Sequence, residues 1–383
     1  MAMKYGKKNE VKINPLKYNL MLIGESGIGK TTLIKEYCEK LAGENGYIFL
    51  EIGKEDGADA ISGINFLNCP EWDMDYDELS NSIGFNTFID DVVDNRSTDW
   101  KDLKVVVIDT SDELFAIAEP EVISMHNREN PDKRVKSIKA AFGGFQGGED
   151  KAIEIVLDRL WALKKVGISF VVIGHTKTRN QTDPITGEDY LQLTTNMPQK
   201  YFNAIKTKVH FLGVAAIDRK IAKEKTGRKD IITKQDIKKG VVKEETRKIT
   251  FRDDNFVIDS KSRFADIVES IPLNVNEFIK ALTDAIKSEQ AKSGKSFEEA
   301  KKQQEEIESE NLKKIAQNEK SNKLKKEINF MLSKIKDYIK ENKSDMSKIR
   351  PILDISKEMG YVNPTLIDSF DDAKKIVDYI EAL

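Results

Sequence analysis

Short hydrophobic runs alternate with helical patterns of apolar and polar positions from about Tyr18 to Phe264. Each run is continuous rather than alternating, as expected for strands that are covered on both faces. This order of strands and helices is typical of a parallel sheet with crossover helices. The predicted strands are Asn19 to Ile23, Tyr47 to Ile52, Val105 to Ile108, Ser169 to Ile173 and Val209 to Ala215.

The pattern changes towards the end of the chain. Between Lys248 and Ile258, apolar and polar residues alternate around an Asp-Asp-Asn turn, which predicts an antiparallel hairpin that closes the sheet. Val275 to Lys287 has the spacing of one amphipathic helix. Ser288 to Lys326 is highly charged with few apolar anchors, so we expect a partly helical connector there. Apolar spacing returns from Ile328 and predicts a small helical domain.

The 383 residues therefore divide into an N-terminal arm (1–17), a core (18–273), a charged helical connector (274–327) and a helical C-terminal domain (328–383). The 62 basic and 65 acidic residues nearly cancel, so any nucleic-acid surface must be local. No apolar run approaches the roughly 18 residues of a membrane span, and the N-terminus has no signal-peptide core. Cys38 and Cys69 have no metal-like spacing and fit a reducing compartment. We expect a cytoplasmic protein without a membrane partner.

The strongest chemical signal is the sequence GESGIGKT, which matches the phosphate-binding pattern G-x-x-x-x-G-K-[ST]. It follows a predicted strand and opens a helix, which is the context that the pattern requires. Backbone amides and the helix N-terminus would hold an anion there. Lys30 would reach the β- and γ-phosphates, and the Thr31 hydroxyl would coordinate magnesium. The predicted nucleotide-binding residues are Gly24, Glu25, Ser26, Gly27, Ile28, Gly29, Lys30, Thr31 and Thr32.

Two further acids complete the predicted nucleotide site. Asp109 ends the buried strand of KVVVIDTSDE and would be the second magnesium ligand, a helix-capping role being the alternative. Asp112 and Glu113 fit the start of the next helix equally well. Hydrolysis needs a carboxylate that orients water, and FLEIGKEDG offers Glu51 and Glu55. We favour Glu55, because it follows the carboxyl end of the strand, where open α/β sheets bind ligands; an ordinary solvated carboxylate is the alternative.

The order phosphate loop, acid after the second strand, VVVID and VVIGHTK resembles the RecA/RadA-type ATPase core over Tyr18 to Leu273. Within that superfamily the chain is most similar to phage-encoded nucleotide-binding proteins of the single-strand annealing and recombination type. The resemblance implies an α/β RecA-like P-loop core with a mainly parallel sheet and a helical C-terminal extension. It also implies ATP and Mg²⁺ as cofactors, and no N-K-x-D pattern occurs between Tyr18 and Leu273, which disfavours a GTPase.

The resemblance also assigns residues to DNA signalling. RecA-like proteins keep a polar γ-phosphate sensor after the fourth strand, which would be His175 here; a structural histidine is the alternative. The following loop, 177–200, is similar in position to the second DNA-binding loop of the family. It carries Lys177, Arg179, Tyr190 and Lys200.

Three other segments are candidate contact surfaces. The excursion after Asp109 combines cations and aromatics suited to single-stranded DNA, or is an ordinary flexible loop: Arg128, Lys133, Arg134, Lys136, Lys139, Phe142 and Phe145. SKSRF (260–264) is similar to the Lys-Asn-Arg-Phe motif of bacterial RadA, so Lys261 and Arg263 would act in trans like an arginine finger or form surface salt bridges. The basic segment from Arg219 to Lys248 is either a protruding hairpin that touches DNA or a solvated insertion.

Together these features predict a Mg²⁺-dependent ATPase that binds single-stranded DNA and promotes annealing or strand exchange in phage-type recombination. Its expected catalytic residues are Lys30, Glu55, Asp109, His175 and Arg263, with Thr31 and Asp109 as metal ligands. We expect a homo-oligomer, ring or filament, in the host cytoplasm if phage-encoded, with a single-strand-binding protein or other replication partner at the C-terminal region. The alternatives are an oligomeric P-loop helicase or helicase loader, and a nucleotide-regulated, non-catalytic assembly protein.

Overall fold

A computed structural model describes residues 9–55, 57–229, 236–253, 257–292, 294 and 296–382. The chain divides into two compact units. The first comprises Met1–Val93 and Trp100–Glu308, and the second comprises Asp94–Asp99 and Ser309–Leu383. The candidate chemistry found in the sequence lies in the first unit.

The first unit contains one mixed sheet. Its strands are β1 Leu20–Gly24, β2 Tyr47–Ile52, β3 Phe66–Cys69, β4 Val105–Asp109, β5 Ser169–Thr182, β6 Asp189–Thr195, β7 Phe211–Lys229, β8 Asp236–Thr250, β9 Lys261–Ser262 and β10 Ser270–Pro272. Within the described residues the order is β10-β8-β7-β1-β5-β4-β2-β3, with β6 beside β5 and β9 beside β7. The inner strands β7, β1, β5, β4 and β2 are parallel, so their carboxyl ends meet at one edge.

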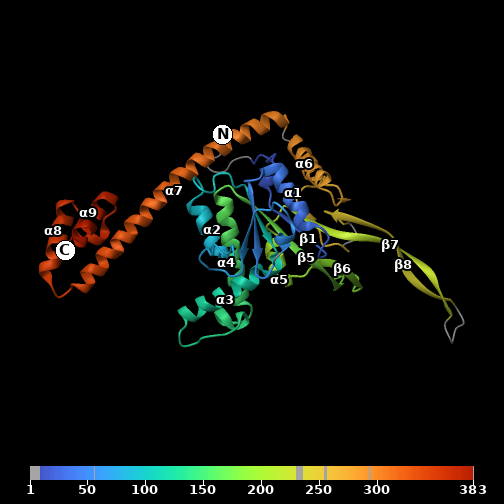
Figure 1. The fold of residues 1–383 in the computed structure, drawn as a ribbon, viewed down its shortest axis with the longest axis horizontal. Helices are drawn as coiled ribbons and strands as arrows, with labels where there is room; N and C mark the ends of the chain where they lie inside the picture. Colours follow the sequence, from blue (N-terminus) through green and yellow to red (C-terminus); the bar gives the residue numbers. More distant parts are fainter. Residues whose placement is uncertain are drawn as a thin grey trace. The chain divides into compact units, whose positions relative to one another are not determined.

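Helices cover both faces of this sheet (Figure 1). One face packs against α2 (Phe85–Asp94), α3 (Ser111–Glu129), α4 (Gly147–Lys165) and α5 (Gln199–Lys206). The other packs against α1 (Lys30–Ala42) and α6 (Val275–Ala291). Short 3-10 helices lie at η1 Pro15–Lys17, η2 Gly57–Ala60 and η3 Ile138–Gly143.

The continuous apolar strands explain these two hydrophobic layers. Successive strand side chains point to opposite faces, so Met21 and Ile23 join the α3 and α4 layer, while Leu20 and Leu22 join the α1 and α6 layer. All four residues are buried. The predicted fold class, α/β with a mainly parallel sheet and a helical C-terminal region, is confirmed.

The described residues of the hairpin predicted between Lys248 and Ile258 pair with other strands instead of with each other. Residues 248–250 end β8 and pair with β7 on one side and β10 on the other. Ile258 instead bridges Leu193 of β6, and residues 254–256 of the predicted turn lie outside the described residues. The prediction was wrong because alternation indicates a half-buried strand but does not identify its partner.

The second unit is helical in its described part. It contains most of α7 (Phe297–Glu341), with α8 (Met346–Glu358), η4 (Pro364–Leu366) and α9 (Phe370–Glu381). Ile335, Ile352 and Ile376 are fully buried in its core. Asp345 caps α8 by accepting a hydrogen bond from the Ser347 amide. In the described part of the chain, no helix combines the length and hydrophobicity that a membrane crossing requires.

Helix α6 contributes a large aromatic residue to the core of the first unit. Phe278 is fully buried and makes ring contacts with Tyr37 and Phe251 at centroid distances of 5.4 and 5.8 Å. We predict that Phe278→Ala lowers the free energy of unfolding of this unit by about 3–5 kcal/mol, because it leaves a cavity. Chemical denaturation measures this, with Leu79→Ala, at a 99% exposed position, as the control. A loss below about 1 kcal/mol would contradict a core role for α6.

Candidate active site

The phosphate loop runs from the end of β1 into α1 at the carboxyl edge of the sheet. Gly29 is the N-cap of α1 and has a φ of 106°, a conformation that favours glycine. A Cβ atom at Gly24 would lie 2.8 Å from the carbonyl oxygen of Ala215 on β7. Glycine at that position therefore permits the close approach of two strands. The first amides of α1 face the loop and favour an anion there.

Lys30, Thr31 and Asp109 meet at this edge. The Lys30 Nζ donates hydrogen bonds to the carbonyl oxygens of Gly24 and Glu25 at 3.2 and 3.0 Å. The Thr31 hydroxyl donates to Oδ2 of Asp109 at 2.8 Å. Lys30 and Asp109 are both buried. The structure thus brings together three residues that the sequence assigned to one site.

The electrostatics of this group suit a nucleotide with a magnesium ion. Burial raises the pKa of Asp109 to about 6, and the hydrogen bond from Thr31 acts in the opposite direction. Burial lowers the pKa of Lys30, and the charge of Asp109 opposes that shift. Among the described residues no cluster of three His, Cys, Asp or Glu side chains would hold a metal unaided. Thr31 and Asp109 fit Mg²⁺, which is commonly held by one or two protein oxygens together with substrate phosphates.

Glu51 and Glu55 occupy different environments. Glu51 is 3% exposed, and its Oε1 accepts a hydrogen bond from the Ala58 amide at 2.5 Å. Burial raises the pKa of Glu51 to about 7, opposed by that hydrogen bond and reinforced by the charge of Asp109. Glu55 lies beyond β2, and its charge also raises the pKa of Asp109. Both acids border the site, so the choice of Glu55 as catalytic carboxylate stays a prediction.

Asp112 joins the site through His175. One carboxylate oxygen of Asp112, Oδ2, accepts hydrogen bonds from the backbone amide of His175 at 2.9 Å and from its Nδ1 at 2.8 Å. Nδ1 therefore carries a proton, which leaves Nε2 as the other ring nitrogen for a ligand. In the sheet His175 is the register partner of Gly24, where the phosphate loop begins. The histidine lies where the sensor was predicted, and its sensing role stays a prediction.

A family model described as AAA domain matches residues 16–264, well over half of the chain. The chain belongs to the AAA domain family. A crystal structure of a KaiC-like protein from the hyperthermophilic archaeon Pyrococcus horikoshii OT3 is 14% identical, with 69% of this chain and 94% of that chain covered and a TM-score of 0.33. No curated protein matches the chain.

The AAA domain match spans the phosphate loop and Asp109, so the site is that of a P-loop ATPase-type domain. A bound magnesium ion would neutralise charge on the nucleotide phosphates. Lys30 would face the phosphate oxygens, while Thr31 and Asp109 would hold the metal. Glu51 and Asp109 are buried, so their charges would interact with the bound groups more strongly than in water.

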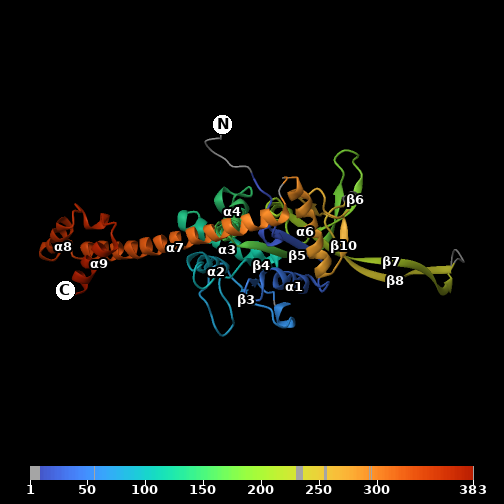
Figure 2. The ribbon, with the colours of Figure 1, turned by 90° about the horizontal axis from the view of Figure 1, so that it is seen from above.

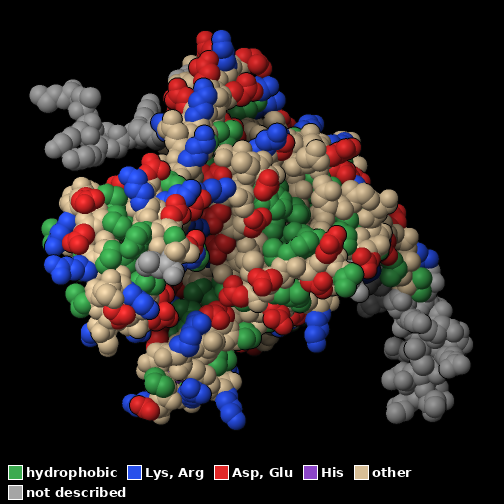
Figure 3. Space-filling model, turned by 60° about the vertical axis from the view of Figure 1, so that its left-hand side comes forward, with side chains coloured by type: hydrophobic (Ala, Val, Ile, Leu, Met, Phe, Trp, Pro, Cys, Tyr) green, Lys and Arg blue, Asp and Glu red, His purple; other side chains and the backbone are tan. Residues whose placement is uncertain are grey.

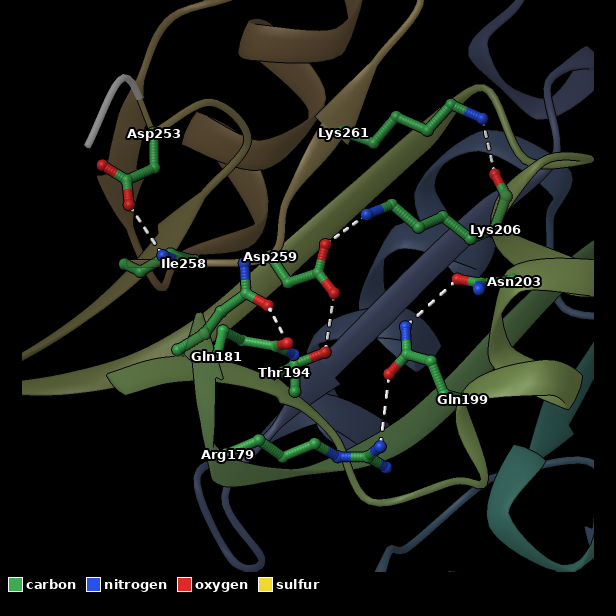
Figure 4. Close-up of polar contacts among 11 residues, drawn as sticks. Arg179, Gln181, Thr194, Gln199, Asn203, Lys206, Asp253, Ile258, Asp259 and Lys261 are labelled. Atoms are coloured by element: carbon green, nitrogen blue, oxygen red, sulfur yellow. Dashed lines mark hydrogen bonds and ion pairs between the residues drawn. The ribbon is translucent and has the colours of Figure 1, made fainter. Parts of the chain in front are cut away.

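Most of the segment predicted as a loop at 177–200 of the AAA domain is instead an ordered hairpin. Strand β5 continues past the sheet edge and pairs antiparallel with β6. The Arg179 side chain contacts its own chain. Its guanidinium donates to Gln199 Oε1 at 3.2 Å (Figure 4) and to the Thr195 carbonyl at 3.2 Å. Lys200 forms an ion pair with Asp150. The segment is mostly a hairpin and not an irregular loop, a difference that its polar side chains did not indicate, and its DNA-binding role stays a prediction.

The base of this hairpin is fixed by a buried acid that the sequence did not single out. Asp259 accepts a hydrogen bond from Thr194 Oγ1 at 2.6 Å and pairs with Lys206 of α5 (Figure 4). Lys261 donates to the Lys206 carbonyl at 2.5 Å. Lys261, one of the two predicted trans cations, is therefore engaged within its own chain.

Arg263 lies at the opposite end of the strands from the phosphate loop of its own chain. Its guanidinium donates to the Thr207 carbonyl at 2.6 Å, and its amide donates to the His210 carbonyl at 2.9 Å. The adjoining β9 pairs with Phe211 and Leu212, the first residues of β7. The structure does not bring Arg263 to the site in cis, and its role towards a neighbouring subunit stays a prediction.

The excursion between α3 and α4 is organised by His126, which the sequence gave no reason to select. The Phe142 amide donates to Nδ1 of this buried histidine at 3.1 Å, so Nε2 carries the proton and donates to the Lys133 carbonyl at 3.2 Å. Phe142 is half-buried against the His126 ring, whereas Phe145 is fully exposed. Arg128 pairs with Glu121. Exposed cations remain at Lys133, Arg134, Lys136 and Lys139.

The metal assignment is tested by Asp109→Asn. The amide oxygen still accepts the Thr31 hydrogen bond, but the charge that attracts Mg²⁺ is lost. We predict nearly unchanged nucleotide binding without metal and at least a 100-fold slower Mg²⁺-dependent hydrolysis, measured by phosphate release during a Mg²⁺ titration. Asp75→Asn, in an exposed loop, is the control. Wild-type magnesium dependence in Asp109→Asn would move the metal role to another acid.

The raised pKa of Glu51 predicts how stability depends on pH. A raised carboxyl pKa means that the folded state favours the protonated form, so Glu51 weakens folding progressively as pH rises from about 4.5 to about 7. Glu51→Gln keeps an acceptor for the Ala58 amide without the charge. We predict that the free energy of unfolding of this variant, relative to wild type, increases by about 1–2 kcal/mol from pH 5 to pH 8. Denaturation at each pH measures it. A pH-independent difference would refute the assigned shift.

Proposed function

We propose that this AAA domain protein is a Mg²⁺-dependent ATPase that binds single-stranded DNA and promotes annealing or strand exchange in phage-type recombination. The observation that carries the proposal is the hydrogen bond between Thr31 and Asp109 beside Lys30. It sits at the sheet edge where His175 begins the extension of β5 towards the β5–β6 hairpin. A nucleotide-dependent change at His175 therefore has a direct backbone route to a protruding element.

The excursion between α3 and α4 supports the DNA component. Its exposed cations suit backbone phosphates, and exposed Phe145 suits stacking against an unpaired base. Phe145 and the neighbouring Gln146 both have positive φ angles, 43° and 75°. Lys200 of α5 donates to the Gln146 carbonyl at 3.2 Å. This hydrogen bond links the excursion to α5, the helix that follows the β5–β6 hairpin.

Assembly completes the proposed mechanism. Arg263, at the end of the core opposite to its own phosphate loop, would approach the γ-phosphate of a neighbouring subunit in a ring or filament. The helical second unit would recruit a single-strand-binding protein or another replication partner. ATP-dependent unwinding of a forked duplex would favour a helicase instead, and DNA-independent binding to one protein would favour a regulatory assembly protein.

ATP turnover and DNA affinity test the proposal together. We expect single-stranded DNA to raise turnover, and we expect its binding to weaken steeply with salt because phosphate contacts release counterions. Replacing Lys133, Arg134 and Lys136 by Gln should reduce the slope of log K against log salt by about 0.7 per lost contact. Lys313, Lys314 and Lys320 of α7, replaced by Gln, form the matched control. Turnover indifferent to DNA, or equal slopes in both variants, would contradict the proposal.

A further inference from the structure

The long β7–β8 hairpin differs in charge from the rest of the protein. We call residues 216–229 and 236–248 the arm. The segment 218–248 has 12 basic and 6 acidic residues, a net charge of +6, whereas the whole chain has −3. The remainder of the chain therefore carries −9. One face of the molecule shows basic and acidic side chains intermixed (Figure 3). The arm is, by its sequence, a local concentration of positive charge.

The arm is a two-stranded antiparallel ribbon that leaves the sheet. Its pairing runs from Ala216 opposite Lys248 to Lys229 opposite Asp236, with two irregularities in register. It projects away from the sheet in both views (Figures 1 and 2). At about 3.3 Å per residue, residues 216–229 reach up to roughly 45 Å. An isolated ribbon of this kind is marginally stable in water, and the major groove of a DNA duplex has room for a two-stranded ribbon.

The net positive charge of the arm suits a polyanion. The duplex backbone carries one negative charge per about 1.7 Å of axis, so several arm cations would meet phosphates at once.

The base of the arm contacts the phosphate loop. Strand β1 ends at Gly24, opposite Ala215, whereas β7 continues past that point into the arm. From β8, Arg247 donates through Nη1 to the carbonyl oxygen of Ile28 in the loop at 3.2 Å. The Arg219 guanidinium lies 3.9 Å from the carboxylate of Glu25, also in the loop. Movement of the arm base therefore acts on the backbone that would hold the nucleotide.

We propose that the arm binds double-stranded DNA, and that Arg247 and Arg219 couple this binding to the phosphate loop. This inference extends the proposed function. The coupling rests on the proposed binding of a nucleotide at the phosphate loop, whereas duplex binding by the arm does not depend on it. The duplex site is separate from the excursion assigned to single strands. Because coupling between two binding sites is reciprocal, duplex on the arm changes nucleotide affinity by the same factor as nucleotide changes duplex affinity.

Duplex binding is tested by removing charge from the arm. The variant carries Gln at Lys223, Lys225, Lys238 and Lys239, and the probe is a labelled duplex of about 30 base pairs, longer than the arm. Fluorescence anisotropy over a salt series should show at least tenfold weaker binding and a slope reduced by up to about 3.6. The control carries Gln at Lys301, Lys302, Lys313 and Lys314 of α7. Unchanged duplex affinity and slope in the arm variant would overturn the proposal.

A single-stranded probe of equal length separates this proposal from the function above. We expect the arm variant to retain single-strand binding within about threefold. An equal loss for both probes would overturn the separate duplex site. A protein that fails to bind single strands, but binds duplex through the arm, would refute the proposed function and leave the arm assignment supported.

Coupling is tested by Arg247→Ala, with Lys248→Ala as the control, because Lys248 pairs with Asp218 on the surface instead of contacting the loop. In the wild type we expect saturating duplex to change ATP affinity at least about fivefold. Arg247→Ala should reduce this factor below about twofold while duplex affinity is retained, whereas Lys248→Ala should keep the factor. An equal factor in all three proteins would overturn the coupling.

Discussion

In-register parallel pairing of β1, β5, β4 and β2 is the constraint on which the candidate site depends. The pairing sets Gly24 opposite His175 and Glu51 opposite Asp109. Neighbouring strands lie about 4.8 Å apart, so residues remote in the sequence reach the same level of one edge. The hydrogen bond between Thr31 and Asp109 joins the start of α1 to the end of β4 at this edge. A shift of one residue in any strand would turn these side chains to the other face.

The site gains its chemistry at a cost in stability. Burial lowers the pKa of Lys30 and raises the pKa values of Asp109 and Glu51, so each charged form is disfavoured without a ligand. Phosphate oxygens and Mg²⁺ would offset that cost by supplying opposite charges. The hydrophobic layers on both faces of the sheet hold the strands in place despite this cost in stability.

Two protruding elements begin at this same edge. Strand β5 continues into the β5–β6 hairpin after His175, and β7 continues into the arm after Ala215. Both residues are register partners of Gly24, on opposite sides of it. The two extended hairpins therefore begin on either side of the end of β1, where the phosphate loop starts. This arrangement gives a physical basis for the proposed link between nucleotide state and the two hairpins.

The sequence by itself determined the buried strands, the phosphate loop and the acid at the end of β4, because continuous apolar runs and a glycine-rich loop report local structure. It also located the C-terminal helices through their apolar spacing. Only the tertiary structure showed that Asp112 holds His175, that Arg179 is used internally, and that Arg247 reaches the phosphate loop. It also replaced the predicted hairpin at 248–258 with pairing of residues 248–250 to β7 and β10. Strand partners and side-chain contacts between residues far apart in the chain depend on packing, which no local pattern encodes.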